Sequence, residues 1–247
     1  MTRAALLACG ILGLASTAAA ETVTLKVPGF RPSVVVPPAA KEGKRPVVIA
    51  LHGNFDRAQW NCEELPALVQ GRAWLVCIRG VPRKDTPKEL NRWTYGARSR
   101  VLAEIDAALS ALDARYPGRV DRERPLLAGF SLGAIYSARF AVATPARFPR
   151  LYLVEGSHKV WTAKNMRRFA RKGGKAVLFG CGRKGCGAWS RRLCRGFARL
   201  KVRCAEVTVP GLGHSYGDPL PRRARPLFRE LISDDPRFSA VDPAPGR

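Results

Sequence analysis

The sequence predicts an α/β fold, with a mostly parallel central sheet, helices on both faces and an antiparallel hairpin at its N-terminal end. Short continuous apolar runs, of which residues 46–51 are the first, recur along the chain and are typical of strands buried on both faces. Stretches with helical spacing separate these runs, as crossovers between parallel strands require. The chain of 247 residues has no internal repeat and no linker, which favours a single domain.

The expected elements alternate along the chain. Residues 21–36 alternate apolar and polar positions around a turn at Pro28 and Gly29, which predicts the opening hairpin. Buried strands are expected at residues 46–51, 73–78, 125–129, 151–154, 176–179 and 204–209. Helices are expected around residues 60–65, 101–112 and 134–142, between the fourth and fifth of these strands, at the basic segment 191–199, and at 223–232. Residues 79–96 are rich in proline and charge, and a loop is expected there.

Residues 1–20 have the pattern of a secretory signal peptide. A positive start at Arg3 leads into an apolar stretch, and small residues at Ala18 and Ala20 provide a cleavage site. We expect cleavage after Ala20 and a secreted or periplasmic protein. A lipoprotein cleaved before Cys9 and an ordinary N-terminal helix are the alternatives.

The rest of the chain has the composition of a folded protein. Hydrophobic residues make up 46%, which argues against wholesale disorder. No apolar run approaches the roughly 20 residues that span a bilayer, so no transmembrane segment is expected. We expect one domain over residues 21–232, a flexible tail over 233–247, and a monomer.

Six cysteines follow the leader, an even number that favours disulfides in an oxidising compartment. The first two flank a helix-to-strand connection. The other four cluster late in the chain, where the most local solution pairs neighbours. The expected pairs are Cys62–Cys77, Cys181–Cys186 and Cys194–Cys204. A metal site is the alternative, but the spacing lacks the Cys-x2-Cys of zinc knuckles, so no metal is expected.

The charge is strongly unbalanced, with a formal net charge of +24. Residues 156–205 contain no Asp or Glu, and such a basic field attracts nucleic acid, acidic polysaccharide or lipid head groups. The aromatic interleaving typical of single-strand binders is absent, so no specific nucleic acid is expected. The favoured interpretation is the solvated face of one helix, with an anionic surface or polysaccharide as the alternative partner. This face comprises Arg191, Arg192, Arg195 and Arg199.

A Gly-x-Ser-x-Gly motif provides the candidate nucleophile, Ser131. The motif follows the strand expected at 125–129 and precedes the helix expected at 134–142. A strand that turns sharply into a helix holds its middle residue in a strained, exposed position, and its neighbours have no room for side chains. The alternative is a small-residue turn without chemistry.

His214 is the candidate general base. It follows the last expected strand in a Gly-Leu-Gly-His segment, from which it could take the proton of Ser131. The alternative is a capping or surface histidine. His52 precedes the serine and is expected to shape the loop that donates an oxyanion amide, whereas His158 has no assigned role beyond the surface or the rim.

The surroundings of the nucleophile follow from the same motif. We expect the backbone amides of Leu132 and of Asn54 or Phe55 to hold the developing negative charge. Trp93 and Tyr95 are expected at the entrance, where aromatic rings favour apolar or aromatic acyl groups. Packing of Trp93 into the core is the alternative.

Over about residues 46–232 the chain resembles the α/β-hydrolase superfamily. It is most similar to the secreted polyester-depolymerase and feruloyl-esterase-like branch, with its dienelactone-hydrolase and prolyl-oligopeptidase-like relatives. The motifs that carry the resemblance are His52-Gly53, Gly129-Phe-Ser131-Leu-Gly133 and Gly213-His214. The resemblance implies a single-domain α/β-hydrolase with a Ser-His-acid triad.

The acid departs from the pattern of this superfamily. Its members usually carry an Asp after the strand at 176–179, but residues 180–186 contain no carboxylate. Some members take the acid from the preceding strand, which implies Glu155 here. Asp218 is a second candidate, although it lies only four residues after His214, and a dyad without an acid is the third.

These observations predict a secreted serine esterase that acts on a small-molecule or polymeric ester and needs no cofactor. A serine peptidase with the same machinery is the alternative among enzymes. A non-catalytic protein that binds an anionic polymer or envelope through its basic surface is the alternative from another class.

Overall fold

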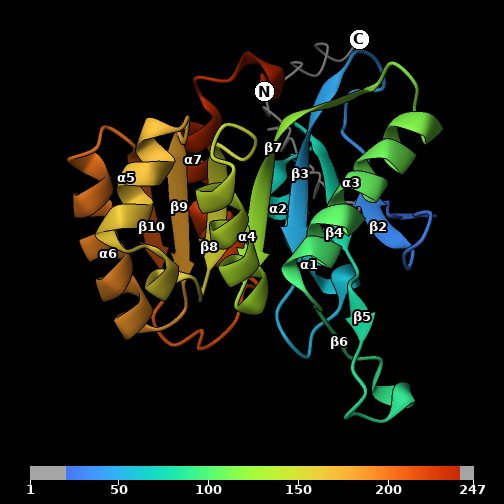
Figure 1. Cartoon of the computed structure of the whole chain (residues 1–247), viewed down its shortest axis with the longest axis horizontal. Coiled ribbons are helices and arrows are strands. Elements are labelled where there is room, and N and C mark those ends of the chain that lie inside the picture. Colours follow the sequence, from blue (N-terminus) through green and yellow to red (C-terminus); the bar gives the residue numbers. More distant parts are fainter. Residues whose placement is uncertain (1–20, 240–247) are drawn as a thin grey trace, which may run out of the picture.

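The computed structural model describes residues 21–239, so the predicted leader at residues 1–20 and the last part of the predicted tail, 240–247, lie outside the described residues. One eight-stranded sheet runs in the order β1-β2-β4-β3-β7-β8-β9-β10 (Figure 1). Its strands are β1 (Val23–Leu25), β2 (Ser33–Val36), β3 (Arg45–Leu51), β4 (Trp74–Ile78), β7 (Val120–Phe130), β8 (Arg150–Val154), β9 (Ala176–Cys181) and β10 (Arg203–Thr208). β2 pairs antiparallel with β1 and β4, and every later pair in this sheet is parallel. The predicted hairpin and mostly parallel sheet are confirmed.

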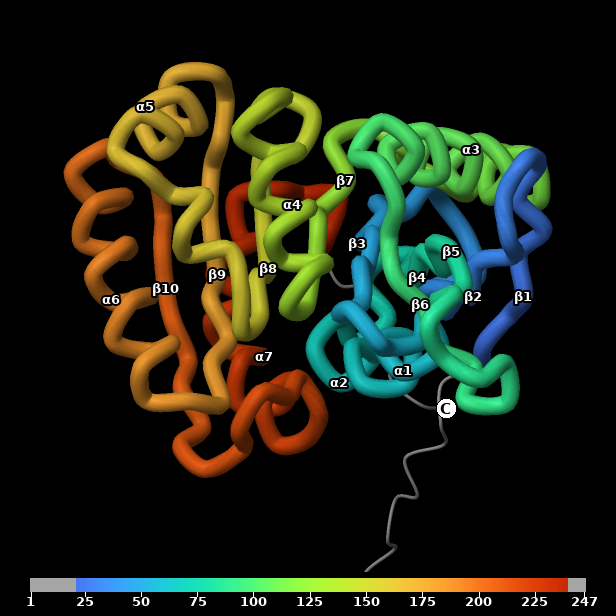
Figure 2. Tube along the Cα trace, turned by 60° about the horizontal axis from the view of Figure 1, so that its bottom comes forward, coloured from blue at the N-terminus to red at the C-terminus, as the bar shows by residue number. Residues whose placement is uncertain are grey.

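Helices cover both faces of the sheet (Figure 2). One face carries α3 (Arg98–Arg115), α4 (Leu132–Ala143), α5 (Ala163–Arg171) and α6 (Lys184–Ala198), and the other carries α1 (Ala58–Glu64), α2 (Pro66–Val69) and α7 (Leu220–Ile232). Three single turns of 3-10 helix are η1 (Lys88–Leu90), η2 (His158–Val160) and η3 (Pro236–Phe238). Among residues 21–239, no helix is both long and apolar enough to cross a membrane.

The apolar run of β3 shows how the sheet forms two cores. Val47, Ile49 and Leu51 pack with α3 and α4 on one face, whereas Val48 and Ala50 pack with α1 and α7 on the other. Successive side chains of a strand point to opposite faces, so a strand between two helical layers must be apolar throughout. Each fully buried aliphatic side chain of this kind stabilises the fold by about 1.5–3 kcal/mol.

β7 is longer than the strand expected at 125–129, because it begins at Val120. Its first half pairs with the start of β3, and the register shifts between Pro46 and Val48. Proline has no amide hydrogen to donate, which accounts for an irregular ladder at this point. Residues 121–124 are charged and mostly exposed, so this part of the strand has no apolar pattern that the sequence could show.

The segment expected as a loop at 79–96 forms a small antiparallel ribbon of β5 (Val81–Pro82) and β6 (Trp93–Thr94). This ribbon projects from the end of the sheet to which the arrows of β3 and β9 point (Figure 1). In parallel sheets that carboxyl end carries the loops that bind and react with ligands.

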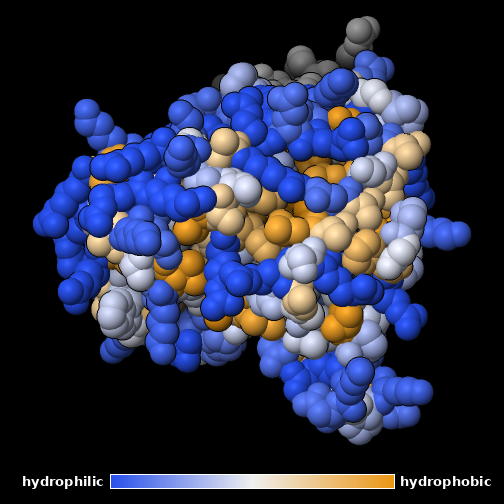
Figure 3. Space-filling model, in the orientation of Figure 1, coloured by the Kyte–Doolittle hydropathy of each residue, from blue (hydrophilic) through white to orange (hydrophobic). Residues whose placement is uncertain are grey.

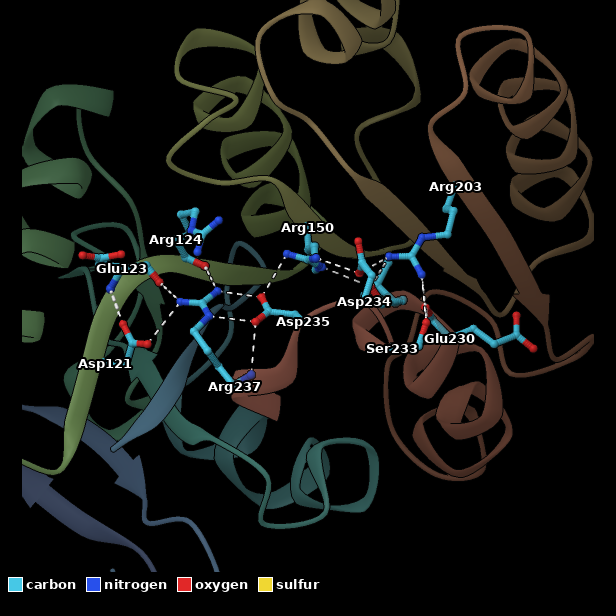
Figure 4. A network of polar contacts seen from close by, with 11 residues as sticks. Asp121, Glu123, Arg124, Arg150, Arg203, Glu230, Ser233, Asp234, Asp235 and Arg237 are labelled. Atoms are coloured by element: carbon cyan, nitrogen blue, oxygen red, sulfur yellow. Dashed lines mark hydrogen bonds and ion pairs between the residues drawn. The ribbon is translucent and has the colours of Figure 1, made fainter. Parts of the chain in front are cut away.

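The first residues of the expected tail fold back onto the opposite end of the sheet. Asp235 pairs with Arg150 at 3.1 Å and with Arg237 at 2.7 Å, and the Arg237 guanidinium also donates to backbone oxygens of β7 (Figure 4). Phe238 is buried beside them. The folded part of the chain therefore extends beyond the boundary expected at residue 232.

Three disulfides join the six cysteines of the described chain. Cys62–Cys77 connects α1 with β4, Cys194–Cys204 connects α6 with β10, and Cys181–Cys186 connects the end of β9 with the first turn of α6. Each pair is the one expected from its spacing. The third joins cysteines five positions apart at the carboxyl end of the sheet.

Candidate active site

Three side chains from separate strands meet at the carboxyl end of the sheet. Ser131 lies between β7 and α4, His214 follows β10, and Glu155 follows β8. The Ser131 Oγ lies 2.8 Å from the His214 Nε2, and the His214 Nδ1 lies 3.3 Å from a Glu155 carboxylate oxygen. The Glu155 side chain is fully buried, whereas that of His214 is 44% exposed. The nucleophile and the base candidates are thus in contact and open to solvent on one side.

Ser131 has the backbone strain that a sharp strand-to-helix turn imposes, with φ at 49° and ψ at −109°. A Cβ atom at Gly133 would lie 2.0 Å from the Leu51 carbonyl oxygen, and one at Gly129 would lie 2.6 Å from the backbone of Gly133. Neither position can accept a side chain. Such strain costs about 1–3 kcal/mol, and the surrounding packing holds it in place.

Two backbone amides beside Ser131 are free to bind an oxyanion. Among residues 21–239, neither the Leu132 amide nor the Asn54 amide has a hydrogen-bond partner. Leu132 is the first residue of α4, where the helix dipole favours negative charge. The Phe55 amide, which was the other candidate, donates to the Trp93 carbonyl at 3.0 Å and is therefore occupied.

Buried polar contacts hold the loop that carries Asn54. The His52 carbonyl accepts from the Gly133 amide at 3.1 Å, and the His52 amide donates to the Tyr95 hydroxyl at 2.8 Å. The Tyr95 hydroxyl in turn donates to the Ile78 carbonyl. Burial lowers the pKa of the His52 imidazole, which keeps the ring neutral.

Tyr95 lies in the core, so the expectation that it lines the entrance is corrected. Its ring is 6% exposed and stacks on that of His52 at 4.5 Å between ring centres. Trp93 is half-buried in β6, and its indole N–H donates to the Asn91 side chain. Its backbone carbonyl accepts from the Phe55 amide, so Trp93 supports the loop that carries Asn54 and Phe55. It is not among the residues that line the cleft.

Glu155 is held by the loop that follows β9. One carboxylate oxygen accepts from the amides of Gly182 and Arg183, at 2.8 Å and 3.0 Å. The other accepts from the Arg183 Nε at 2.6 Å. The superfamily pattern places its acid in this loop, whereas here the loop supplies donors to an acid from the neighbouring strand. The Cys181–Cys186 disulfide closes the same loop.

The cleft beside Ser131 has a volume of about 590 Å³. It is lined by Asn54, Phe55, Asp56, Trp60, Glu63, Glu64, Phe130, Ser131, His214, Ser215, Tyr216 and Gly217. Sequence reasoning missed Trp60, Glu63, Glu64 and Tyr216, because they fall in helices and loops without a motif. Burial is the main cause that raises the pKa of the Glu64 carboxyl.

His158 forms a grouping of possible metal ligands with Cys181 and Cys186, but the two cysteines offer no thiolate. Its Nε2 is 3.0 Å from the Ser190 hydroxyl, and the sulfurs of Cys181 and Cys186 are nearby. Both sulfurs belong to a disulfide, and a metal ligand must be a thiolate. Burial is the main cause that lowers the pKa of the His158 imidazole, which is half-buried at the edge of a second hollow.

That second hollow, the basic groove, lies on the face of α4, α5 and α6 and has a volume of about 1020 Å³. Figure 3, drawn from this face, shows apolar residues between hydrophilic ones. The cations of the basic groove are Arg98, Arg139, Lys159, Lys164 and Arg168, and no carboxylate is among its lining residues. Trp189, which is 57% exposed, adds an aromatic face.

No protein-family model matches the chain, and no curated protein sequence is significantly similar to it. Solved structures do match. A Bacillus cereus carboxylesterase aligns over 81% of this chain and 93% of its own, with 14% identity and a TM-score of 0.57. A ferulic acid esterase aligns over 85% of this chain and 96% of its own, with 16% identity and a TM-score of 0.53.

An acylaminoacyl peptidase in complex with Z-Gly-Gly-Phe-chloromethyl ketone aligns over 86% of this chain, with 15% identity and a TM-score of 0.52. The aligned part is 40% of the peptidase, so the chain spans about two fifths of that protein. The order of the sheet, the strained turn at Ser131 and these likenesses agree. The chain has the fold of the α/β-hydrolase superfamily.

Proposed function

We propose that the protein is a serine hydrolase that cleaves carboxylic esters through an acyl-enzyme. The observation that carries the proposal is the 2.8 Å contact between the Ser131 hydroxyl and the His214 Nε2 on a strained turn. A hydroxyl at such a contact can pass its proton to the imidazole while it attacks a carbonyl carbon. Glu155 is the proposed acid, because its carboxylate lies behind the same ring.

The chemistry divides into two balanced steps. Ser131 Oγ forms a bond to the ester carbonyl carbon, His214 takes the hydroxyl proton, and the Asn54 and Leu132 amides bind the resulting oxyanion. The tetrahedral intermediate then expels the alcohol, which leaves with the proton from His214. In the second step a water molecule gives its proton to His214 and attacks the acyl carbon, and the acid product leaves as Ser131 regains its proton.

Ester hydrolysis is favoured over peptide hydrolysis by the extent of the structural likeness. The chain aligns with nearly the whole length of the two esterases but with only 40% of the peptidase. The proposal also includes a small-molecule or polymeric ester as substrate and membership of the feruloyl-esterase-like branch. A serine peptidase remains the second candidate among enzymes, since its machinery is the same.

The proposal extends to the location and state of the protein. Three disulfides in a chain of this size favour an oxidising compartment, such as the periplasm or the exterior of the cell. The proposal also includes a leader over residues 1–20, a single domain after it, and a monomeric state.

The test compares hydrolysis of short-chain p-nitrophenyl esters by the wild type, Ser131→Ala and Glu155→Gln. Loss of activity in both variants supports the triad, and loss in Ser131→Ala alone removes Glu155 from it. Labelling with a fluorophosphonate provides a check that is independent of the substrate. A wild type that neither hydrolyses these esters nor reacts with the fluorophosphonate would overturn the proposal.

The basic groove favours a second candidate function, the binding of an anionic polymer. Its lining carries cations over an apolar floor, which suits an extended chain with negative groups. Retention on heparin resin that falls steeply with salt, and that weakens in Lys159→Ala combined with Lys164→Ala, supports this function. Equal retention of wild type and variant contradicts it.

A further inference from the structure

The guanidinium of Arg183 lies between the acid and the base of the proposed triad. Its Nη2 is 3.0 Å from the His214 Nδ1 and 2.5 Å from a Glu155 oxygen. The direct contact between His214 and Glu155 is longer, at 3.3 Å. Charge-assisted hydrogen bonds are usually about 2.7–2.9 Å long. The carboxylate is thus bound more closely by the arginine than by the histidine.

Two groups compete for the Nδ1 of His214: the Arg183 guanidinium, which needs a lone pair there, and the Glu155 carboxylate, which needs a proton. A guanidinium donates hydrogen bonds and never accepts them. When the Arg183 Nη2 donates across its 3.0 Å contact, the Nδ1 accepts through its lone pair, and the proton of the neutral ring lies on the Nε2. An Nε2–H at 2.8 Å from the Ser131 Oγ donates to the hydroxyl and cannot take its proton.

The reactive form needs the opposite tautomer, with Nδ1–H donating to Glu155 and a free lone pair on Nε2. Its formation requires the guanidinium to leave the Nδ1. A positive charge beside the ring also opposes the imidazolium that forms during attack. The arginine therefore disfavours catalysis in two ways: it favours the unreactive tautomer of His214, and its positive charge destabilises the imidazolium.

Arg183 is able to leave. Its side chain is 56% exposed, and it is the residue before the first turn of α6, where its side chain makes no capping bond. Without the guanidinium, Glu155 still accepts from the backbone amides of Gly182 and Arg183. The acid is thus held in place independently of the arginine side chain.

Building on the proposed function, we propose that Arg183 is a latch that holds the site in a resting tautomer, and that an anionic group on the ester substrate releases it. In the resting site the Nε and Nη2 of Arg183 both contact one oxygen of Glu155. A carboxylate or phosphate on a substrate can compete for this guanidinium, because either anion can accept two parallel hydrogen bonds from it. In this mechanism Arg183 is a positioning residue, and the substrate class is esters that carry a negative charge near the scissile bond.

The other charged groups of the cleft do not replace this role, because the charged residues that line it are the carboxylates Asp56, Glu63 and Glu64. Phe130 packs against the His214 ring at 4.9 Å between ring centres. Among residues 21–239, the polar groups in hydrogen-bond contact with the His214 imidazole are those of Ser131, Glu155 and Arg183.

The first test reads the tautomer directly. In ¹⁵N-labelled protein, the chemical shifts of the ring nitrogens of His214 distinguish Nδ1–H from Nε2–H at a pH where the ring is neutral. We expect Nε2–H in the wild type and in Lys184→Ala, and Nδ1–H in Arg183→Ala. The control removes the same charge one residue away. The same tautomer in the wild type and Arg183→Ala overturns the proposal.

The second test compares p-nitrophenyl acetate, which is neutral, with p-nitrophenyl hemisuccinate, which carries a carboxylate. We expect Arg183→Ala to raise kcat/KM for the acetate about tenfold and to abolish the preference of the wild type for the hemisuccinate. Lys184→Ala should keep that preference. Lower activity on both esters in Arg183→Ala, with the tautomer unchanged, means that the arginine only supports Glu155.

These outcomes separate the latch from the proposed function. Labelling of Ser131 by a fluorophosphonate reports the nucleophile in every variant. A protein that labels but has the same tautomer with and without Arg183 is a hydrolase without the latch. A protein that is never labelled is not the proposed hydrolase, and both proposals are then rejected.

Discussion

The buried carboxylate of Glu155 accepts a hydrogen bond of 2.8 Å from the backbone amide of Gly182. The acid therefore comes from the end of β8, while its support comes from the loop after β9. A loop that carries no carboxylate thus still contributes to the site, because it fixes the position of one that enters from the neighbouring strand. Several measurable effects depend on this division.

Glu155→Gln should lower kcat for p-nitrophenyl esters by about 10²–10⁴-fold with little change in KM. The amide cannot stabilise the imidazolium as a carboxylate does, and a comparable change in another serine hydrolase has an effect of about 10⁴-fold. The control is Glu206→Gln, since Glu206 is a carboxylate of β10 that pairs with Arg191 away from Ser131. Near-normal kcat in Glu155→Gln would exclude this acid.

Replacing Cys181 and Cys186 by Ala should lower kcat clearly and change the free energy of unfolding only slightly. Their disulfide closes the loop that presents two amides to Glu155, and it joins residues only five positions apart. Replacing Cys194 and Cys204 should have the opposite balance, because their bridge spans ten residues and lies between α6 and β10. Stabilisation by a disulfide grows with the length of the closed loop and is typically about 2–4 kcal/mol.

The measurements for the two disulfide variants are kcat and the midpoint of urea unfolding. We expect loss of Cys181–Cys186 to affect mainly kcat, and loss of Cys194–Cys204 to affect mainly the midpoint of unfolding. Equal rates in the two variants would show that closure of the loop does not matter to the acid.

Tyr95→Phe should lower the free energy of unfolding by about 1–3 kcal/mol and should also reduce kcat. The change leaves the buried His52 amide without its acceptor, which costs the desolvation of that group. The loop that carries Asn54 begins directly after His52, so a disturbance there should also displace the Asn54 amide and reduce kcat. Tyr136→Phe is the matched control, because its hydroxyl donates to the Gly96 carbonyl in a less buried place. Urea unfolding and ester hydrolysis measure the two effects, and equal stabilities would contradict the assigned role.

The C-terminal ion pairs should make stability fall at acid pH. Burial by itself would raise the pKa of Asp235, but its pairs with Arg237 and Arg150 outweigh burial and hold that pKa below its usual range. A carboxyl whose folded pKa is depressed stabilises the fold above its unfolded pKa of about 3.9. This stabilisation is lost as the pH falls through the folded pKa.

Asp235→Asn should therefore flatten the dependence of unfolding free energy on pH below about pH 4, while it lowers stability near neutral pH. Urea unfolding at a series of pH values measures both. Asp106→Asn, which removes an exposed partner of Arg147, is the control and should change the pH dependence little. An unchanged slope in Asp235→Asn would mean that the pairs contribute no pH-dependent stability.

Sequence reasoning was strongest where local constraints act. The sheet was predictable because strands between two helical layers must be apolar throughout, as in β3. Ser131 was recognisable because its turn excludes side chains at Gly129 and Gly133, which leaves a mark in the sequence itself. The contact of Ser131 with His214 joins residues 83 positions apart, yet their order along the chain was enough to suggest it.

Other features carry no local mark. Arg183 is one cation in a long basic stretch, and only the fold brings it to His214. Tyr95 lies in a segment rich in proline and charge, yet it is buried by its stacking on His52. The packing of Asp235 depends on Arg150, 85 positions away, so a composition typical of a loose tail concealed a folded segment.

The Cys181–Cys186 disulfide links the structure of the site to the oxidation of two cysteines. With the two residues as thiols, the loop that presents the Gly182 and Arg183 amides to Glu155 would lose its covalent closure, while the sheet would keep its own contacts. The order of the acid site would then depend on the redox state of one short loop.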